Sequence, residues 1–180
     1  MKLSNKISVI CIALTIVLSG LVYLQVAAKE PGANTQQIKQ IQDGCLSLKN
    51  TLNQLHVSDA LLRVNMGQRY ELVSTKLIDR FNSRVASNGF NVDNFNVVSV
   101  NYKLALDSFR LSYKSYEEAL TVAIKIDCSI QPSEFYDALL LARDDRAKLY
   151  ATVQELNKQV DQYQSAVGQF EKDFQSGKVK

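Results

Sequence analysis

Two cysteines are the residues of this chain best suited to a defined chemical role. Cys45 and Cys128 lie in the polar part of the sequence, whereas Cys11 falls in an apolar N-terminal run. A pair of cysteines in a small domain outside the cytoplasm is typical of a disulfide, and two separately buried thiols are the alternative. Neither Cys-x-x-Cys spacing nor Cys/His spacing accompanies the pair, so the pattern gives no indication of a metal site.

The residue types that most often catalyse reactions do not form a recognisable site. His56 is the single histidine, and we interpret it as a surface or edge residue of a helix. The acidic pairs Glu117–Glu118 and Asp144–Asp145 are adjacent in sequence, so their carboxylates point about 100° apart on a helix and do not converge. The sequence has no nucleophile elbow, zinc-protease motif or phosphate-binding glycine loop. We predict a protein that is not an enzyme and that has no cofactor or metal.

A heptad repeat in the C-terminal part predicts a long helix over residues 132–174. Its apolar residues recur in alternating steps of four and three, which is the spacing of a coiled-coil stripe. Pro132 suits the first turn of such a helix. The stripe consists of Phe135, Leu139, Ala142, Arg146, Leu149, Val153, Leu156, Val160, Tyr163, Val167, Phe170 and Phe174.

Arg146 is the one residue of this stripe that is not apolar. It could mark a buried ligand site. Alternatively, its aliphatic stem packs while its head group reaches water, or it pairs with an acid and fixes the register of the helices. We favour these last two readings.

Two further helices are predicted over residues 35–87 and 94–126. Asn88 and Gly89 end the first helix, with Gly89 in the left-handed conformation, and Asp93 is a good N-cap for the second. Gly67 predicts a bend or a close helix approach. The first stripe is Ile38, Ile41, Cys45, Leu48, Leu52, Leu55, Leu62, Met66, Tyr70, Val73, Leu77 and Val85.

The second of these helices carries a stripe rich in tyrosine. Such a stripe could bind sugars or peptides, but at helical spacing it more often belongs to a core, with hydroxyls that reach a partner at its edge. The residues are Phe95, Val98, Tyr102, Leu106, Phe109, Tyr113, Tyr116, Leu120 and Ala123.

Three long helices joined by short turns predict an all-α, elongated antiparallel three-helix coiled-coil bundle over residues 35–175. Cys45 lies 44 residues before Gly89 and Cys128 lies 39 residues after it. An antiparallel hairpin therefore brings both cysteines to the same end of the bundle, which supports a Cys45–Cys128 disulfide.

The N-terminal residues predict a membrane helix. Lys2 and Lys6 precede an uncharged apolar run over residues 7–28, which is long enough to span a bilayer of ~30 Å. We expect an uncleaved signal anchor with a cytoplasmic N-terminus, and a cleaved signal peptide is the alternative. Either way the body is extracytoplasmic, after a linker over residues 29–34. Residues 176–180 are expected to form a disordered tail.

The charge balance excludes a class of partner. The chain has 21 basic and 18 acidic residues, a formal net charge of +3. Removing the two lysines of the N-terminal segment leaves +1, whereas a nucleic-acid-binding protein should carry a strong basic stripe. We therefore expect no nucleic acid among the partners.

The helix ends carry a resemblance to a known group of proteins. The turn over residues 88–92 reads Asn-Gly-Phe-Asn-Val, and the last helix opens as Asp-Cys over 127–128 followed by Pro-Ser-Glu-Phe over 132–135, with Leu139 and Ala142-Arg143 beyond. In these features the chain resembles uncharacterised extracytoplasmic three-helix proteins of candidate-phyla bacteria such as Saccharibacteria, over roughly residues 60–160. The resemblance implies location and fold, and no activity.

The leading functional hypothesis is a membrane-anchored structural or interaction protein of the cell envelope. Its tip at Asn88, Gly89 and Phe90, with nearby Val97 and Val100, is the expected contact region for an envelope or surface protein. Leu104 and Leu111 extend these apolar residues, which form either a broader core or an exposed docking strip. The body is expected to be monomeric. The alternatives are a periplasmic-type holdase chaperone and a helical-hairpin accessory subunit of a secretion or efflux assembly.

Overall fold

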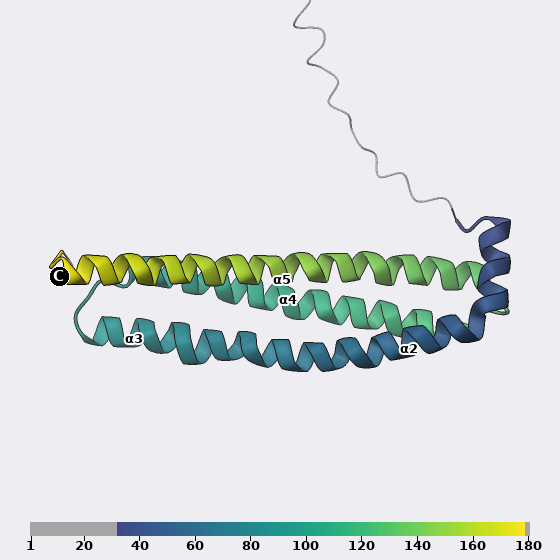
Figure 1. Cartoon of the computed structure of the whole chain (residues 1–180), viewed down its shortest axis with the longest axis horizontal. Coiled ribbons are helices and arrows are strands. Elements are labelled where there is room, and N and C mark those ends of the chain that lie inside the picture. The colour runs from purple at the N-terminus through teal and green to yellow at the C-terminus, as the bar shows by residue number, and fades with distance from the viewer. Residues whose placement is uncertain (1–31, 179–180) are drawn as a thin grey trace, which may run out of the picture. The chain divides into compact units, whose positions relative to one another are not determined.

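The computed structural model describes residues 32–178, and every regular element in that range is a helix. The elements are α2 (Thr35–Leu72), the π-helical segment η1 (Val73–Ile78), α3 (Asp79–Ser87), α4 (Asp93–Lys125) and α5 (Pro132–Gln175). α2, η1 and α3 follow one another without a break, and α4 and α5 run back and forth beside them to form a three-helix bundle (Figure 1).

The predicted membrane helix over residues 7–28 lies outside the described residues, as do residues 29–31 of the expected linker. No helix between residues 32 and 178 combines the length and the apolar character needed to cross a bilayer. The helical start of α2 is defined locally by a capping box, in which the Asn34 side chain accepts from the Gln37 backbone and the Gln37 side chain accepts from the Asn34 backbone.

The predicted first helix is interrupted by the π-helical turn at Val73–Ile78. A π turn holds an additional residue, so it rotates the residues that follow relative to a regular heptad. Ile78, only 1% exposed, faces the core, whereas Leu77 is 60% exposed. The prediction that Leu77 belongs to the buried stripe is therefore wrong. Leu62, which is 56% exposed, is also not part of the core.

The close helix approach, one of the two explanations predicted for Gly67, is wrong. The residue lies inside the continuous helix α2, and a Cβ atom added there would meet only Phe109 Cε1, at 4.0 Å. That distance is an ordinary van der Waals contact, so no neighbouring element requires glycine. The irregularity of the first rod lies instead in η1, a few residues further on.

The tyrosine-rich stripe of α4 lies in the core of the bundle, which confirms the favoured interpretation of this stripe. All nine of its residues are buried. The hydroxyl of Tyr102 donates to the backbone carbonyl of Tyr70 at 2.9 Å, and the hydroxyl of Tyr116 donates to the Asp59 carboxylate at 2.6 Å. These partners are why tyrosine can occupy positions that would otherwise favour phenylalanine or leucine.

The turn between α3 and α4 is closed by glycine and by aromatic packing. Gly89 has a φ of 80°, as predicted, and the Phe90 N–H donates to the Val85 carbonyl at 3.2 Å, which completes a Schellman-type ending. The Phe90 ring is half-buried against Phe170 and Phe174. It therefore closes the core at this end, in contrast to the expectation that it forms part of a projecting contact tip.

The helix cap predicted at Asp93 is replaced by a different arrangement. Asp93 is the first residue of α4, and the Asn91 side chain accepts a hydrogen bond from the Asp93 backbone N–H at 2.7 Å. At the other end of the chain, the backbone N–H groups of residues 176–178 donate hydrogen bonds to the last turn of α5. Residues 179–180 of the expected disordered tail lie outside the described range.

The opposite end of the bundle contains the cysteine pair. The Cys45 and Cys128 sulfur atoms are bonded, with their Cα atoms 5.5 Å apart, and Cys128 is fully buried. The first turns of α2 lie across this end of the bundle (Figure 1), where Ile41 packs in the same cluster as Phe135. The Gln42 side-chain amide also donates to the Ser129 carbonyl at 3.2 Å. The structure thus brings together the two cysteines that the sequence paired.

Candidate functional site

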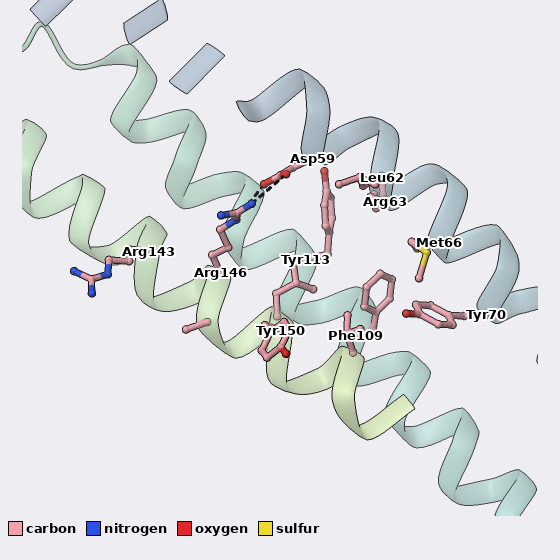
Figure 2. Close-up of a pocket in the computed structure, with 13 residues that line it drawn as sticks. Asp59, Leu62, Arg63, Met66, Tyr70, Phe109, Tyr113, Arg143, Arg146 and Tyr150 are labelled. Atoms are coloured by element: carbon pink, nitrogen blue, oxygen red, sulfur yellow. Dashed lines mark hydrogen bonds and ion pairs between the residues drawn. The ribbon is translucent and has the colours of Figure 1, made fainter. Parts of the chain in front are cut away.

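A groove of about 730 Å³ lies between α2 and α5 in the middle of the bundle, with α4 as its floor (Figure 2). It exists because α4 and α5 pack closely against each other, while α2 contacts both of them much less and α5 least. The apolar lining residues are Leu62, Met66 and Tyr70 from α2, Phe109 and Tyr113 from α4, and Leu149, Tyr150 and Val153 from α5.

The two rims of the groove expose apolar side chains to solvent. Leu62 on α2 is 56% exposed and Tyr150 on α5 is 66% exposed. Below them, Phe109 and Tyr70 are buried and meet edge to face, with ring centroids 5.2 Å apart. A ligand lying in the groove would therefore cover apolar surface without displacing the core beneath it.

One end of the groove is closed by an ion pair between α2 and α5. Asp59 accepts from Arg146, whose Nε lies 3.3 Å from a carboxylate oxygen, and it also accepts from the Tyr116 hydroxyl at 2.6 Å (Figure 2). The Asp59 side chain is 13% exposed and that of Arg146 is 53% exposed. Burial, and then the hydrogen bond to Asp59, raise the pKa of Tyr116. Arg146 thus pairs with an acid while its head group stays accessible, in line with the favoured interpretation of its sequence.

Two more arginines line the groove, and neither forms an ion pair with the residues that the structure describes. The Arg63 guanidinium lies 4.7 Å from the centroid of the Tyr113 ring, in a cation–π contact. Arg143 is one turn before Arg146 on α5. The groove is therefore lined by three arginines and a single carboxylate, which already accepts from Arg146 and Tyr116, and in Figure 2 the Arg143 guanidinium points away from Arg146.

Tyr70 leaves a buried polar atom without a partner at the other end of the groove. Its side chain is 5% exposed, and its hydroxyl has no hydrogen-bond partner among the described residues. In Figure 2 this hydroxyl points toward Phe109 on the groove floor. Burial raises the pKa of Tyr70, because the ionised phenolate would be poorly solvated there.

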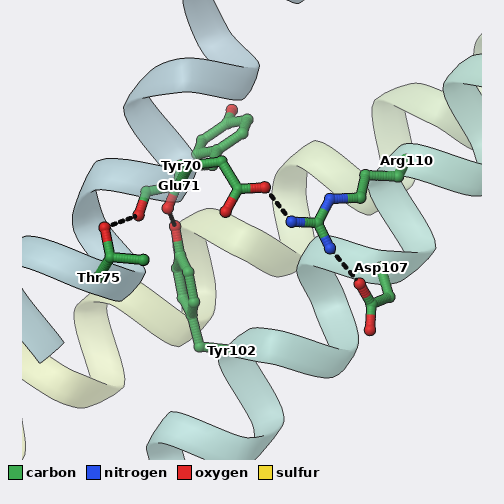
Figure 3. Close-up of polar contacts among 6 residues, drawn as sticks. All are labelled: Tyr70, Glu71, Thr75, Tyr102, Asp107 and Arg110. Atoms are coloured by element: carbon green, nitrogen blue, oxygen red, sulfur yellow. Dashed lines mark hydrogen bonds and ion pairs between the residues drawn. The ribbon is translucent and has the colours of Figure 1, made fainter. Parts of the chain in front are cut away.

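Polar contacts on the opposite side of α2 hold it against α4 (Figure 3). Arg110 pairs with both Glu71 of α2 and Asp107 of its own helix, and Lys103 pairs with Asp79 at 2.9 Å. Together with the hydrogen bond from Tyr102 to the Tyr70 carbonyl, these contacts fix the region around η1 on α4. They keep α2 on that side, and the groove toward α5 stays open.

A second exposed apolar surface lies on α4, opposite the core. We define the back strip as Val97, Val100, Leu104 and Leu111, which are 59%, 57%, 61% and 68% exposed. Position 104 is about 200° around the helix from the buried Tyr102 and Leu106, so it points directly away from the core. Of the two possibilities that the sequence left open for these residues, the structure shows exposure.

The other candidate residues from the sequence do not form a site in the described part of the chain. Asn88 and Gly89 are exposed at the turn. His56 is half-buried, and its Nε2 atom has no partner among the described residues. Within residues 32–178, no group of three or more His, Cys, Asp or Glu side chains is placed to hold a metal ion.

The groove residues were not identified from the sequence apart from Arg146. The spacing of apolar residues is less regular between Leu61 and Gly67, and this was the available signal. In the structure, Leu62 and Arg63 from this stretch are exposed and line the groove together with Arg146. Comparison of the chain with family models, with curated proteins and with solved structures finds no match.

Proposed function

We propose that this chain is a non-enzymatic interaction protein of the cell envelope, anchored by residues 7–28, whose bundle binds a helical segment of an envelope protein along the back strip. The back strip is the observation that carries the proposal. Its four apolar side chains are all more than half exposed and repeat at helical spacing over about 21 Å of α4. A partner helix with a matching apolar stripe would bury them.

The extracytoplasmic location is supported by the Cys45–Cys128 pair. Disulfides persist in oxidising compartments and are rare in the cytoplasm. The apolar run over residues 7–28, preceded by Lys2 and Lys6, supports the same location through the positive-inside rule. The core clusters of the bundle are filled by residues of α2, η1, α3, α4 and α5 from a single chain, which supports a monomeric body.

Site-specific photo-crosslinking with the full chain, in the cells that produce it, tests the docking surface. A photoreactive residue at Leu104 or Leu111 should give one discrete product that is heavier than the chain. The matched control position is Asp161, an exposed residue of α5. Substitution of Val100 and Leu104 by lysine should abolish the product formed from Leu111, while the thermal unfolding temperature stays unchanged.

Two outcomes would contradict this proposal. One is an identical set of products from Leu111 and from Asp161, because a random collision does not depend on the face of the bundle. The other is a product that survives the double lysine substitution. In either case the back strip is solvent-exposed surface without a docking role.

A further inference from the structure

We infer that the groove between α2 and α5 binds an anionic amphiphile, in which an acyl chain carries a carboxylate or phosphate head group. This ligand site is distinct from the back strip and does not depend on it. The volume of about 730 Å³ falls in the range of small-molecule sites, roughly 300–1,000 Å³. The lining is mainly apolar, with Leu62 and Tyr150 exposed on opposite rims.

The arginines indicate that the head group of the ligand is negatively charged. Arg63, Arg143 and Arg146 all line the groove, and only Asp59 opposes them. That carboxylate already accepts from Arg146 and from the Tyr116 hydroxyl. Arg63 and Arg143 therefore have free donors, which carboxylate and phosphate oxygens accept with favourable geometry.

The polar and apolar groups are separated along the groove, as they are in an amphiphile. α2 and α5 run in the same direction, and Asp59 contacts Arg146 at the end nearer the disulfide (Figure 1). Phe109, Tyr70 and Val153 lie toward the other end. We place the head group beside Arg63 and Arg146, at the end of the groove that Arg143 also lines, and the acyl chain along Met66 and Phe109 toward Tyr70.

The Tyr70 hydroxyl is the second indication of a ligand. It is buried in the lining of the groove, it points toward Phe109 on the groove floor (Figure 2) and it has no hydrogen-bond partner in the described chain. A bound molecule with an acceptor along its apolar body, such as an ester carbonyl, would satisfy it.

The length of the groove favours a small amphiphile over a protein helix. From Asp59 to Tyr70 the axis of α2 rises by about 16 Å, which corresponds to only about three helical turns. The helices that pack stably in this bundle are much longer, 33 residues in α4 and 44 in α5. A short helical segment would gain little from a groove of this length.

A fluorescence titration tests the site in the full chain, held in nanodiscs of a neutral phospholipid. The chain has no tryptophan, so Tyr150→Trp places a single reporter on the rim of the groove. Dodecanoate should shift the emission of this reporter to shorter wavelength with saturation. Dodecyltrimethylammonium, which has the same chain length and the opposite charge, should bind at least tenfold more weakly.

Charge reversal separates head-group recognition from partitioning into the nanodisc. Arg63→Glu with Arg143→Glu should weaken dodecanoate binding by about tenfold or more, since a hydrogen bond to a charged group typically contributes that much. Arg80→Glu, an exposed arginine of α3 outside this groove, should leave the affinity unchanged. Circular dichroism confirms that each variant is folded.

A phosphate arm distinguishes the two sources of head group. Lysophosphatidic acid with a dodecanoyl chain should bind more tightly than dodecanoate if the natural ligand is a phospholipid derivative, and less tightly if it is a free fatty acid. Tyr70→Phe should weaken the lysophosphatidic acid, which has an ester carbonyl, more than it weakens dodecanoate.

Three results would overturn the inference: equal binding of the anionic and cationic amphiphiles, an unchanged dodecanoate affinity in the Arg63/Arg143 variant, or no spectral response to any amphiphile. If an acidic amphipathic helical peptide alone shifts the reporter, the groove is a protein-docking site and the amphiphile assignment is wrong.

Discussion

Asp59 is the residue on which the geometry of the groove depends. It joins all three rods, because it lies on α2, accepts from Tyr116 of α4 and pairs with Arg146 of α5. An ion pair with an exposed arginine contributes little by itself. The short hydrogen bond from the buried tyrosine adds to it and leaves the carboxylate only 13% exposed. The cluster therefore sets the separation of α2 and α5 at one end of the groove.

The substitution Tyr70→Phe tests what the unpartnered hydroxyl contributes to stability. Its hydroxyl is buried and unpartnered, whereas its ring packs on Phe109 and would remain in place. Removing such a hydroxyl should raise the free energy of unfolding of the unliganded protein by about 1 kcal/mol. Urea denaturation measures this change. Tyr102→Phe is the matched control, because that hydroxyl donates to the Tyr70 carbonyl, and its loss should lower the free energy by about 1 kcal/mol.

If both tyrosine variants lowered the stability equally, the Tyr70 hydroxyl would have a partner in solution. The unliganded groove would then contain a tightly held water at this position, and the hydroxyl would need no ligand acceptor.

At the scale of the helix, packing does not require glycine at position 67. A Cβ atom there would reach only van der Waals contact with Phe109, at 4.0 Å. Alanine is favoured over glycine inside a helix by about 1 kcal/mol. Gly67→Ala should therefore raise the free energy of unfolding by about 0.5–1 kcal/mol in urea denaturation. Gly89→Ala is the opposite case, since φ is 80° there, and it should destabilise by about 1 kcal/mol. A loss of stability in Gly67→Ala would mean that α2 and α4 approach more closely than the structure shows.

The helices also show what sequence periodicity could and could not predict. All nine stripe residues predicted for α4 are buried, because a regular helix places residues three and four apart on one face. The small residues Ser99, Ala105 and Ala119, which widen this buried face, were not predicted. Leu77 was assigned wrongly because the π turn at Val73–Ile78 advances the face, and no residue type marks a π turn. Arg146 was recognised as an exception in its stripe. Its partner Asp59, 87 residues away, could be found only once the register of α2 against α5 was known.

At the scale of the whole molecule, buried tyrosines make the stability of the folded state depend on pH. Burial, and then the nearby Asp79 carboxylate, raise the pKa of Tyr163 to about 12 from 10.0. Burial also raises the pKa of Tyr70 and of Tyr113. The unfolded chain loses these protons near pH 10, whereas the folded chain keeps them. The resulting stability is fully present below pH 10 and is lost as pH rises through about 12.

The bundle should consequently unfold in alkaline solution between about pH 10 and 12, with tyrosinate absorbance and loss of helical circular dichroism changing together. Tyr163→Phe should move the midpoint to higher pH, since one ionising group is removed from the core. Tyr150→Phe, on the exposed rim, should leave it unchanged. Ionisation of all tyrosines with the helical signal intact would show that the core admits the phenolates.

The cysteine pair acts on the whole molecule because it joins the start of α2 to the turn before α5. The two residues are separated by 83 positions, so the bond closes a loop that contains most of α2 and all of η1, α3 and α4. On the chain-entropy model a loop of that size stabilises the folded state by about 4.5 kcal/mol, as an upper value. Cys45→Ser should lower the free energy of unfolding in urea toward that extent and slow the chain on a non-reducing gel. Cys128→Ser should behave in the same way, and Cys11→Ser should change neither quantity.

The first turns of α2 also contact the end of the bundle through Ile41 and through the Gln42–Ser129 hydrogen bond. These contacts do not depend on the disulfide, so we expect part of this packing to survive in the serine variants. We therefore expect a measurable but partial loss of the free energy of unfolding, which would mean that packing positions α2 and the disulfide adds stability. Complete unfolding of the variant would mean instead that the disulfide itself positions α2.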